Sequence, residues 1–184
     1  VSMRPEMTPT VARMVAARER HYKKPIKWYS APQLFRYERQ QKGRLREHFQ
    51  FNADIFGEDD PASDAELIAL LIDVLRSFDL SAEDFVIRLS SRNAWQDFFT
   101  KNCSDPSHAH EFYQAVDKIE RTPAEESDQK FKLLGFRLEQ VRDFIDSGKP
   151  SEELQIVLDN LSARGLNDYV KIDYNVIRGL AYYT

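Results

Sequence analysis

Residues 35–50 read FRYERQQKGRLREHFQ, a stretch in which aromatic and charged residues surround a single glycine, Gly43. Its alternating character is typical of β-strands, because successive side chains of a strand point to opposite faces. A glycine among polar residues is typical of a turn. The stretch therefore predicts two antiparallel strands joined by a polar loop.

The second of these strands, predicted to run from about residue 44 to residue 56, has one face that is almost entirely polar. Alternate positions put on that face Arg44, Arg46, His48, Gln50, Asn52 and Asp54. The opposite face, which we expect to lie mostly in the core, carries Leu45, Glu47, Phe49, Phe51, Ala53 and Ile55. An antiparallel sheet with one wet face is a common alternative. The planar guanidinium group of arginine, however, can form paired hydrogen bonds to phosphate or carboxylate. Its combination with amide, imidazole and carboxylate groups on this face favours a ligand-binding groove.

Length and composition are ordinary for a globular protein. The chain has 184 residues, of which 42% are hydrophobic and 30% charged, and this predicts one compact domain with room for an inserted sub-domain. No apolar run approaches the roughly 20 residues of a membrane span, and the first residues do not resemble a signal peptide. The single cysteine, Cys103, excludes an internal disulfide and a cysteine zinc site. We therefore expect a cytoplasmic protein that makes no membrane contact.

The net charge of −4 hides an asymmetry along the chain. Residues 1–50 contain 12 lysine or arginine residues against 4 acidic ones, whereas residues 51–184 contain 14 against 26. Opposite signs in the two parts predict that an anion is handled in the N-terminal third. A basic surface that is merely solvated is the alternative.

Hydrophobic periodicity predicts the remaining elements. Residues 8–20 are expected to form a helix capped by Thr8, and residues 63–79 a helix that begins with a capping box of Ser63 and Glu66. The second helix has an apolar stripe of Leu67, Leu70, Leu71, Val74, Leu75 and Phe78. Strands are predicted at 26–30, 33–39, 85–90, 169–174 and 176–183. Further helices are predicted at 92–101, 106–120, 124–147 and 151–164.

Hairpins without regular strand–helix alternation predict an α+β fold, in which an antiparallel β-sheet is flanked by helices. The run of helices predicts an all-helical insertion. We therefore expect a first part of the core at 1–90, the insertion at 91–165 and a return to the core at 166–184.

Several kinds of site find no support in the sequence. The six glycines form no phosphate-binding loop, so arginines must hold any nucleotide. His108 and His110 lie two residues apart and point to different sides of a helix, so we predict no metal site. No serine or cysteine lies in a nucleophile elbow, which leaves covalent catalysis without a candidate.

Three motifs now allow a comparison with a known family. FRYERQQKGRLREHFQFNADIFG (35–57) resembles motif 2 of the class II aminoacyl-tRNA synthetases, in the form found in histidyl-tRNA synthetases. MRPEMTPTVARMV (3–15) resembles the strand and helix that precede motif 2, and IRGLAYYT (177–184) resembles the family's histidine-specific signature. The motifs occur in the right order, with a helical insertion between the second and the third. The resemblance covers essentially the whole chain, although the insertion matches only in character.

The resemblance implies ATP-dependent activation of L-histidine to histidyl-adenylate and its transfer to tRNA(His). Carried over by position, Arg36 would bind the α-phosphate of ATP, Glu38 would touch the adenine side, and Arg44 would reach the β- and γ-phosphates. Mg²⁺ is expected to accompany ATP, with protein ligands that the sequence does not identify.

The histidine pocket follows by the same carry-over. Glu6 and Thr8 would hold the α-amino group, with Gln50 beside it. The imidazole ring would face Asp54, Tyr182 and Tyr183. Arg178 would be catalytic together with Arg36, because it would bridge the amino acid carboxylate and the α-phosphate.

The chemistry that these residues offer agrees with this implied reaction. Adenylation is an attack of a carboxylate on a phosphate, so two anions must be brought together and no protein nucleophile is needed. Two arginines, Arg36 and Arg178, are the minimum that such a reaction needs.

The chain also departs from the family pattern. Ala181 stands where many members have aspartate, and Gln40 replaces a frequent proline. Nothing resembles motif 1, which builds the dimer interface, or motif 3, and the anticodon-binding domain is missing. We therefore expect the chain to be a catalytic-core segment, inactive alone, of a protein that is a homodimer at full length.

Two other readings remain open. The regulatory subunit of ATP phosphoribosyltransferase, in histidine biosynthesis, shares this fold without aminoacylating tRNA, but such proteins tend to lose the arginines and tyrosines that persist here. A synthetase-like binding module in a signalling protein is the third reading. The sequences that flank this segment would discriminate among the three.

Overall fold

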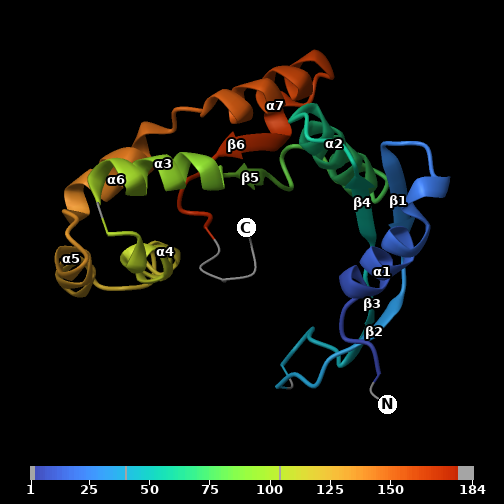
Figure 1. The fold of residues 1–184 in the computed structure, drawn as a ribbon, viewed down its shortest axis with the longest axis horizontal. Helices are drawn as coiled ribbons and strands as arrows, with labels where there is room; N and C mark the ends of the chain where they lie inside the picture. The colour runs from blue at the N-terminus through green and yellow to red at the C-terminus, as the bar shows by residue number, and fades with distance from the viewer. Residues whose placement is uncertain (1–2, 40, 104, 178–184) are drawn as a thin grey trace. The chain divides into compact units, whose positions relative to one another are not determined.

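The computed structural model describes residues 3–39, 41–103 and 105–177 and divides into two compact units, Val1–Ser63 and Asp64–Thr184. Figure 1 shows the elements of both units, each of which is described here by itself. The combination of helices with small, mainly antiparallel strand pairs confirms the α+β class. The insertion boundaries expected from the sequence, 91 and 165, fall inside the second unit and stay a prediction.

The first unit is built on one long antiparallel ribbon. Strand β1 (Ile26–Ser30) pairs with β4 (Asn52–Phe56), and β2 (Gln33–Phe35) pairs with β3 (Glu47–Phe49). The register does not slip between the two pairs: Ser30 faces Asn52, and Gln33, three residues on, faces Phe49, three residues back. The predicted hairpin is therefore confirmed.

The ribbon is interrupted where the sequence predicted continuous strands. Pro32 has no N–H group to give to the ladder, so only its carbonyl takes part, accepting a hydrogen bond from the Gln50 N–H at 3.1 Å. The single strand expected over 44–56 is consequently two short strands, and the strand expected over 33–39 ends at Phe35.

Helix α1 (Thr8–Arg18) packs on one face of the ribbon. Val11 and Val15 of the helix are buried against Ile26, and the rings of Trp28 and Phe56 flank this contact. The helix ends earlier than predicted, because Glu19–His21 forms a 3₁₀ turn.

The opposite face of the ribbon, expected to be buried, is largely exposed. Phe49 is 75% exposed, Leu45 71% and Phe51 46%, and the Phe51 ring stacks on exposed Tyr29 at 6.1 Å between centroids. The prediction of a core face was wrong for this unit. A two-stranded ribbon needs a covering layer on each side to bury both faces, and α1 covers only the side of Ile26 and Trp28.

The second unit contains a helical run between two short strands. Strands β5 (Ile87–Leu89) and β6 (Val170–Ile172) pair in parallel, which differs from the antiparallel pairing expected from the sequence. A parallel pair needs a long crossover connection, and the helices between the two strands provide it. These elements are α3 (Arg92–Asn102), η2 (Pro106–His108), α4 (Ala109–Asp117), α5 (Ala124–Leu133), α6 (Leu138–Ser147), α7 (Glu152–Ala163) and η3 (Asn167–Tyr169).

Two helix predictions need correction. The helix expected over 124–147 is broken after Leu133, where Gly135 adopts a φ of 84° that side chains rarely allow. The break turns Phe136 into the core. Helix α2 (Ala62–Arg76) starts one residue before Ser63, so Ser63 is not its cap. Asp60 takes that role, since its carboxylate accepts the Ala62 N–H at 2.8 Å.

The apolar stripe expected to bury α2 is also misplaced. The buried residues of this helix are Ala65, Ala69 and Ile72. Leu70 and Leu71 of the predicted stripe are exposed instead. Helix α2 is apolar on more than one side, so periodicity alone did not determine which side packs inward.

The core of the second unit is a cluster of aromatic rings. Trp95 is fully buried, and its indole N–H donates to the carbonyl of Tyr174 at 3.2 Å. The ring of Phe112, also fully buried, lies 4.5 Å from Phe136 and 5.8 Å from Trp95 between centroids. Helices that are distant in sequence therefore share one core.

The contrast between buried and exposed phenylalanines gives a stability prediction. Phe112→Ala leaves a cavity among the rings and should lower the free energy of unfolding by about 3–5 kcal/mol. The same substitution at Phe78, which is 72% exposed, should change it by less than about 0.5 kcal/mol. Urea unfolding of the 184-residue chain measures both, and equal losses would contradict the assignment of the core.

Candidate functional site

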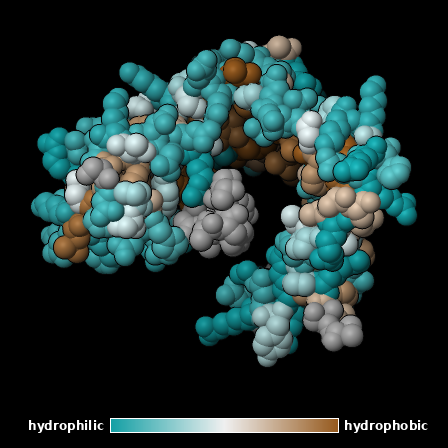
Figure 2. All heavy atoms as spheres, viewed as in Figure 1, coloured by the Kyte–Doolittle hydropathy of each residue, from teal (hydrophilic) through white to brown (hydrophobic). Residues whose placement is uncertain are grey.

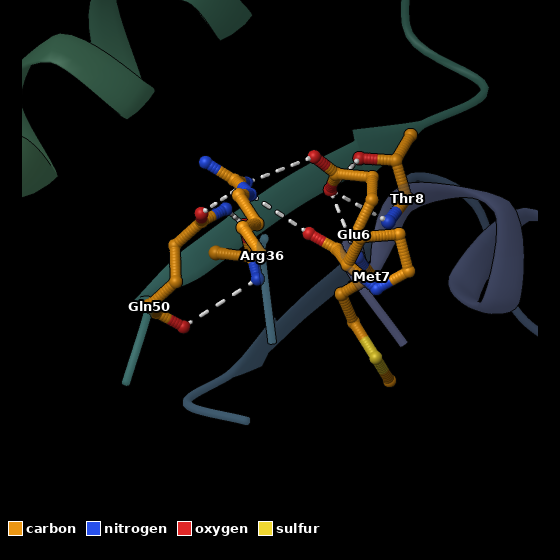
Figure 3. Close-up of polar contacts among 7 residues, drawn as sticks. Glu6, Met7, Thr8, Arg36 and Gln50 are labelled. Carbon is orange, nitrogen blue, oxygen red and sulfur yellow. Dashed lines mark hydrogen bonds and ion pairs between the residues drawn. The ribbon is translucent and has the colours of Figure 1, made fainter. Parts of the chain in front are cut away.

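The candidate site is centred on the guanidinium group of Arg36, just beyond β2. Its Nε donates to the carbonyl of Pro5 at 2.9 Å, and its Nη2 donates to Oε1 of Gln50 at 3.0 Å. The same Nη2 lies 3.6 Å from the carboxylate of Glu6. Figure 3 shows Glu6, Arg36 and Gln50 turned toward one another. One side chain thus connects the N-terminal segment with the two arms of the ribbon.

The N-terminal segment reaches this position because it runs along β2. The carbonyl of Arg4 accepts the N–H of Phe35 at 3.0 Å, and Nε of Arg4 donates to the carbonyl of Gln33 at 2.9 Å. These two bonds place the following residues, Pro5 and Glu6, next to Arg36.

Glu6 caps the start of α1 in addition to facing Arg36. Its Oε1 accepts the N–H groups of Met7 at 2.8 Å and Thr8 at 3.1 Å, and the Thr8 hydroxyl at 3.0 Å (Figure 3). Thr8 was predicted to cap the helix, but the capping carboxylate belongs to Glu6. The Thr8 backbone N–H contributes most to lowering the pKa of Glu6, and the Thr8 hydroxyl, Met7 and the charge of Arg36 add to it. Glu6 is therefore held in its ionised form.

Asp54 lies on β4, on the same ribbon face as Gln50, and pairs in register with Trp28. Its pKa is raised, chiefly by burial and additionally by the negative charge of Glu6. A half-buried carboxylate repelled by a second carboxylate is electrostatically unsatisfied, and a cationic ligand between the two would relieve it.

Gln50 is fixed between two neighbours. While its Oε1 accepts from Arg36, its Nε2 donates to Oδ1 of Asn52 at 2.7 Å. Asn52 has the same face parity as Gln50 and Asp54. Arg36, Gln50, Asn52 and Asp54 therefore form a continuous polar strip.

A cavity of about 300 Å³ lies next to Arg36 toward the hairpin loop. Its lining consists of Arg36, Glu38, Gly43, Arg44, Leu45 and His48. Arg44 forms an ion pair with Glu38, and Nε of Arg46 donates to the Glu38 carbonyl at 3.3 Å. The cavity thus combines two guanidinium groups with one carboxylate, a set that suits a ligand carrying several negative charges.

The residues predicted for the site fall into three groups. Around Arg36 the structure brings together Glu6, Thr8, Gln50 and, through its electrostatic coupling to Glu6, Asp54. Glu38 and Arg44 line the adjacent cavity. Arg178, Tyr182 and Tyr183 lie outside the described residues.

Three groups that contribute to the candidate site were assigned no role in the sequence-based prediction. The carbonyl of Pro5 is a backbone group, so its contact with Arg36 cannot be predicted from a pattern of side chains. Asn52 and His48 were placed on the polar face by their parity alone, and that signal could have assigned them to the site.

Neither a metal cluster nor a membrane segment was found in the part of the chain that the structure describes. No three histidine, cysteine or acidic side chains in residues 3–39, 41–103 and 105–177 lie where they could hold a metal ion. None of the helices over these ranges has the length and apolar character that crossing a bilayer requires.

Comparisons with known proteins match the whole chain to one family. The histidyl-tRNA synthetase family matches residues 1–184. A histidine–tRNA ligase of Opitutus terrae is 42% identical over 100% of this chain and 47% of its own length, and one of Haloarcula marismortui is 34% identical over 100% and 47%. The chain thus spans about half the length of these curated relatives.

Solved structures show the same fold. The crystal structure of a histidyl-tRNA synthetase from Nostoc sp. matches 98% of this chain and 47% of its own, with a TM-score of 0.80 and 20% identity. A structure described as an ATP phosphoribosyltransferase regulatory subunit/histidyl-tRNA synthetase, from Bacillus halodurans, matches 98% of this chain and 52% of its own, with a TM-score of 0.79 and 19% identity.

The raised pKa of Asp54 gives a prediction about stability and pH. Folding disfavours the ionised form of Asp54. The protonated carboxyl group therefore makes its full contribution to the free energy of unfolding below the pKa of an unfolded aspartate, about 3.9, and this contribution is lost as pH rises through the pKa of Asp54 in the folded chain. Asp54→Asn should therefore stabilise the chain at pH 7 and leave its stability unchanged below about pH 3.5. Urea unfolding at a series of pH values measures the difference.

A Glu6→Gln background serves as the control for this prediction. Because the charge of Glu6 raises the pKa of Asp54, the gain from Asp54→Asn at pH 7 should be smaller when Glu6 is neutral. A gain that persists unchanged at low pH would show that ionisation of Asp54 is not its cause.

Proposed function

Because the chain belongs to the histidyl-tRNA synthetase family, we propose that the protein of which it forms part is a histidine–tRNA ligase. The reaction is ATP-dependent activation of L-histidine to histidyl-adenylate, followed by transfer to tRNA(His). The observation that carries the proposal is the contact of Arg36 with Gln50 and Glu6, beside the electrostatically unsatisfied Asp54. This arrangement offers separate places for a phosphate and for an amino acid cation.

The amino acid is held by the two carboxylates in this proposal. Glu6 is kept ionised by the N–H groups at the start of α1, so it can accept the α-ammonium group of histidine, with Thr8 and Gln50 at its sides. Asp54 accepts a ring N–H of the imidazole, and Tyr182 and Tyr183 complete the pocket. A site that pairs both ring nitrogens rejects amino acids that lack them, because its buried partners would be left unpaired.

ATP is held by the arginines. No hydrogen bond within the described part of the chain uses Nη1 of Arg36, and Figure 3 shows this nitrogen outside the contacts drawn. Nη1 is thus the donor that Arg36 offers to the α-phosphate. In the adjacent cavity Arg44 is paired with Glu38, and the β- and γ-phosphates would compete for it while Glu38 turns to the adenine side.

The reaction follows from this placement. A carboxylate oxygen of histidine attacks the α-phosphorus, the bond to the bridging oxygen breaks, and pyrophosphate leaves. Arg36 and Arg178 neutralise the charge that develops on the α-phosphate, so that positioning and electrostatics carry the step.

Mg²⁺ that accompanies ATP would neutralise phosphate charge. In the cavity the carboxylate is that of Glu38, which is paired with Arg44. No three histidine, cysteine or acidic side chains among the described residues lie where they could hold a metal ion, and the protein ligands of Mg²⁺ stay unassigned.

The proposal extends to the whole protein. We infer a cytoplasmic homodimer in which residues 1–90 and 166–184 belong to the catalytic core, 91–165 form the insertion, and the present segment alone is inactive. The chain spans about half of its curated relatives, which is consistent with further parts being required.

A regulatory role is the second candidate. The Bacillus halodurans structure carries both descriptions, regulatory subunit of ATP phosphoribosyltransferase and histidyl-tRNA synthetase, on the same fold. In that role the protein would not form the adenylate.

Histidine-dependent ATP–pyrophosphate exchange by the full-length protein tests the proposal. We expect exchange, and Arg36→Gln should lower its rate by about 10²–10³-fold because a charge that stabilises the transition state is lost. Arg13→Gln is the matched control, since Arg13 lies exposed on α1 in the same unit, and it should leave the rate unchanged. A well-folded protein that binds histidine without exchange would favour the regulatory role.

Arg178 has a separate test. Arg178→Ala should abolish exchange while histidine binding, measured by calorimetry, is largely retained, because this side chain acts mainly on the developing charge. An equal loss of binding and exchange would mean that Arg178 holds the amino acid and is not catalytic.

A further inference from the structure

A strongly basic surface lies at the end of the ribbon opposite the hairpin loop. Residues 18–27 contain five lysine or arginine residues and one glutamate. We call this surface the ribbon-end patch, and its cations are Arg18, Arg20, Lys23, Lys24 and Lys27, all of them exposed. In Figure 1 they belong to the end of α1, the blue connection that follows it and the start of β1. The proposed reaction gives this patch no role.

The positive charge of the patch is poorly neutralised by the chain itself. Lys24 pairs with Glu19, the one acidic residue of the stretch. Within the described residues, no carboxylate lies within ion-pair distance of Arg18, Arg20 or Lys23. Three exposed cations close together in sequence repel one another, and an external anion would relieve that repulsion.

The position of the patch is fixed relative to the candidate site, because both belong to the same ribbon. Gly57, at the end of β4, leaves room for the Lys24 side chain: a Cβ at that position would lie 2.7 Å from Cδ of Lys24. Asp54 is three residues from Gly57, which is about 10 Å along a strand at about 3.3 Å per residue. A ligand on the patch is therefore close to the amino acid end of the site.

The shape of the patch favours a polyanion over a single anion. Its five cations are distributed over ten residues, from the last residue of α1 to β1, and each carries its charge on a separate exposed side chain. A nucleic acid backbone offers phosphates at regular intervals and is bound by such spread cations. Residues 51–184, with 26 acidic residues against 14 basic ones, would repel the same polyanion.

We propose that the ribbon-end patch binds the phosphate backbone of the tRNA close to the end that receives histidine; the identity of this RNA rests on the proposed function. The nucleotide that accepts histidine must reach the amino acid site, and in this proposal the phosphates that lead to it pass within reach of Arg18, Arg20 and Lys23. These contacts position the RNA and carry no sequence preference.

The test compares three versions of the full-length protein with the wild type. Arg20→Glu/Lys23→Glu reverses two cations of the patch for which residues 3–39, 41–103 and 105–177 offer no carboxylate partner. Arg20→Lys/Lys23→Arg keeps both charges. Lys101→Glu/Arg142→Glu makes the same change in net charge at exposed cations of the second unit. The measurements are the Kd for a tRNA(His) transcript by filter binding over a range of salt concentrations, the KM for tRNA in aminoacylation, and histidine-dependent exchange.

Reversal of the patch should raise Kd and KM for tRNA about tenfold and reduce the slope of log Kd against log salt by about 1.5, since each phosphate contact contributes roughly 0.7–0.9. Exchange, which needs no RNA, should be unchanged. The charge-conserving variant should behave as the wild type, and the variant of the second unit should change Kd less than twofold.

Three results would overturn the inference: an unchanged Kd, an equal effect of the second-unit variant, or a reversed variant that has lost its dimer in sedimentation. The last result would assign the patch to a protein interface. If the wild type shows no exchange, the proposed function fails, but the binding measurements still decide whether the patch holds RNA.

Discussion

The guanidinium group of Arg36 is the interaction on which the candidate site depends. It bonds a backbone carbonyl of the N-terminal segment on one side and the amide of Gln50 on the other, with the carboxylate of Glu6 beside it. These partners come from two segments of the first unit, residues 5–6 and Gln50, and Arg36 itself belongs to a third, so local structure does not bring the three segments together. Because arginine presents several donors in a rigid plane, one side chain satisfies all three and keeps a further N–H for a ligand.

The two carboxylates of the site have pKa values that are shifted in opposite directions. Glu6 is stabilised as an anion by the N–H groups that open α1, whereas Asp54 is destabilised as an anion by burial and by Glu6 itself. The fold therefore contains one carboxylate, Glu6, that is stable in its ionised form, and a second, Asp54, whose ionised form a cation would stabilise. A positively charged ligand beside Asp54 would offset the cost of keeping its carboxylate ionised, and the proposed site would then favour a cation before any ring is recognised.

The two units bury their apolar residues to different extents. The second unit closes a core of its own, in which Trp95 and Phe112 make ring contacts with several helices. The ribbon of the first unit is covered by α1 on one face, while Phe49 and Tyr29 remain exposed on the other. This difference accords with a chain that spans about half the length of its relatives. Alternation in the sequence correctly separated the two faces of the ribbon, but it could not show which of them this chain covers.

The sequence by itself determined the α+β class, the hairpin, the helical run and the family, because turn residues, periodicity and short motifs are local signals. It also assigned Gln50, Asn52 and Asp54 to one polar face, since alternate residues of a strand share a face. Tertiary structure alone decided that β5 and β6 pair in parallel, that α2 buries Ala65 and Ile72 in place of its leucines, and that Glu6 caps α1 while it faces Arg36. Each of these depends on contacts between segments that are distant in sequence or on a choice between two apolar surfaces. Local pattern carries no information about such choices, because packing free energy is set by the partner that a surface meets.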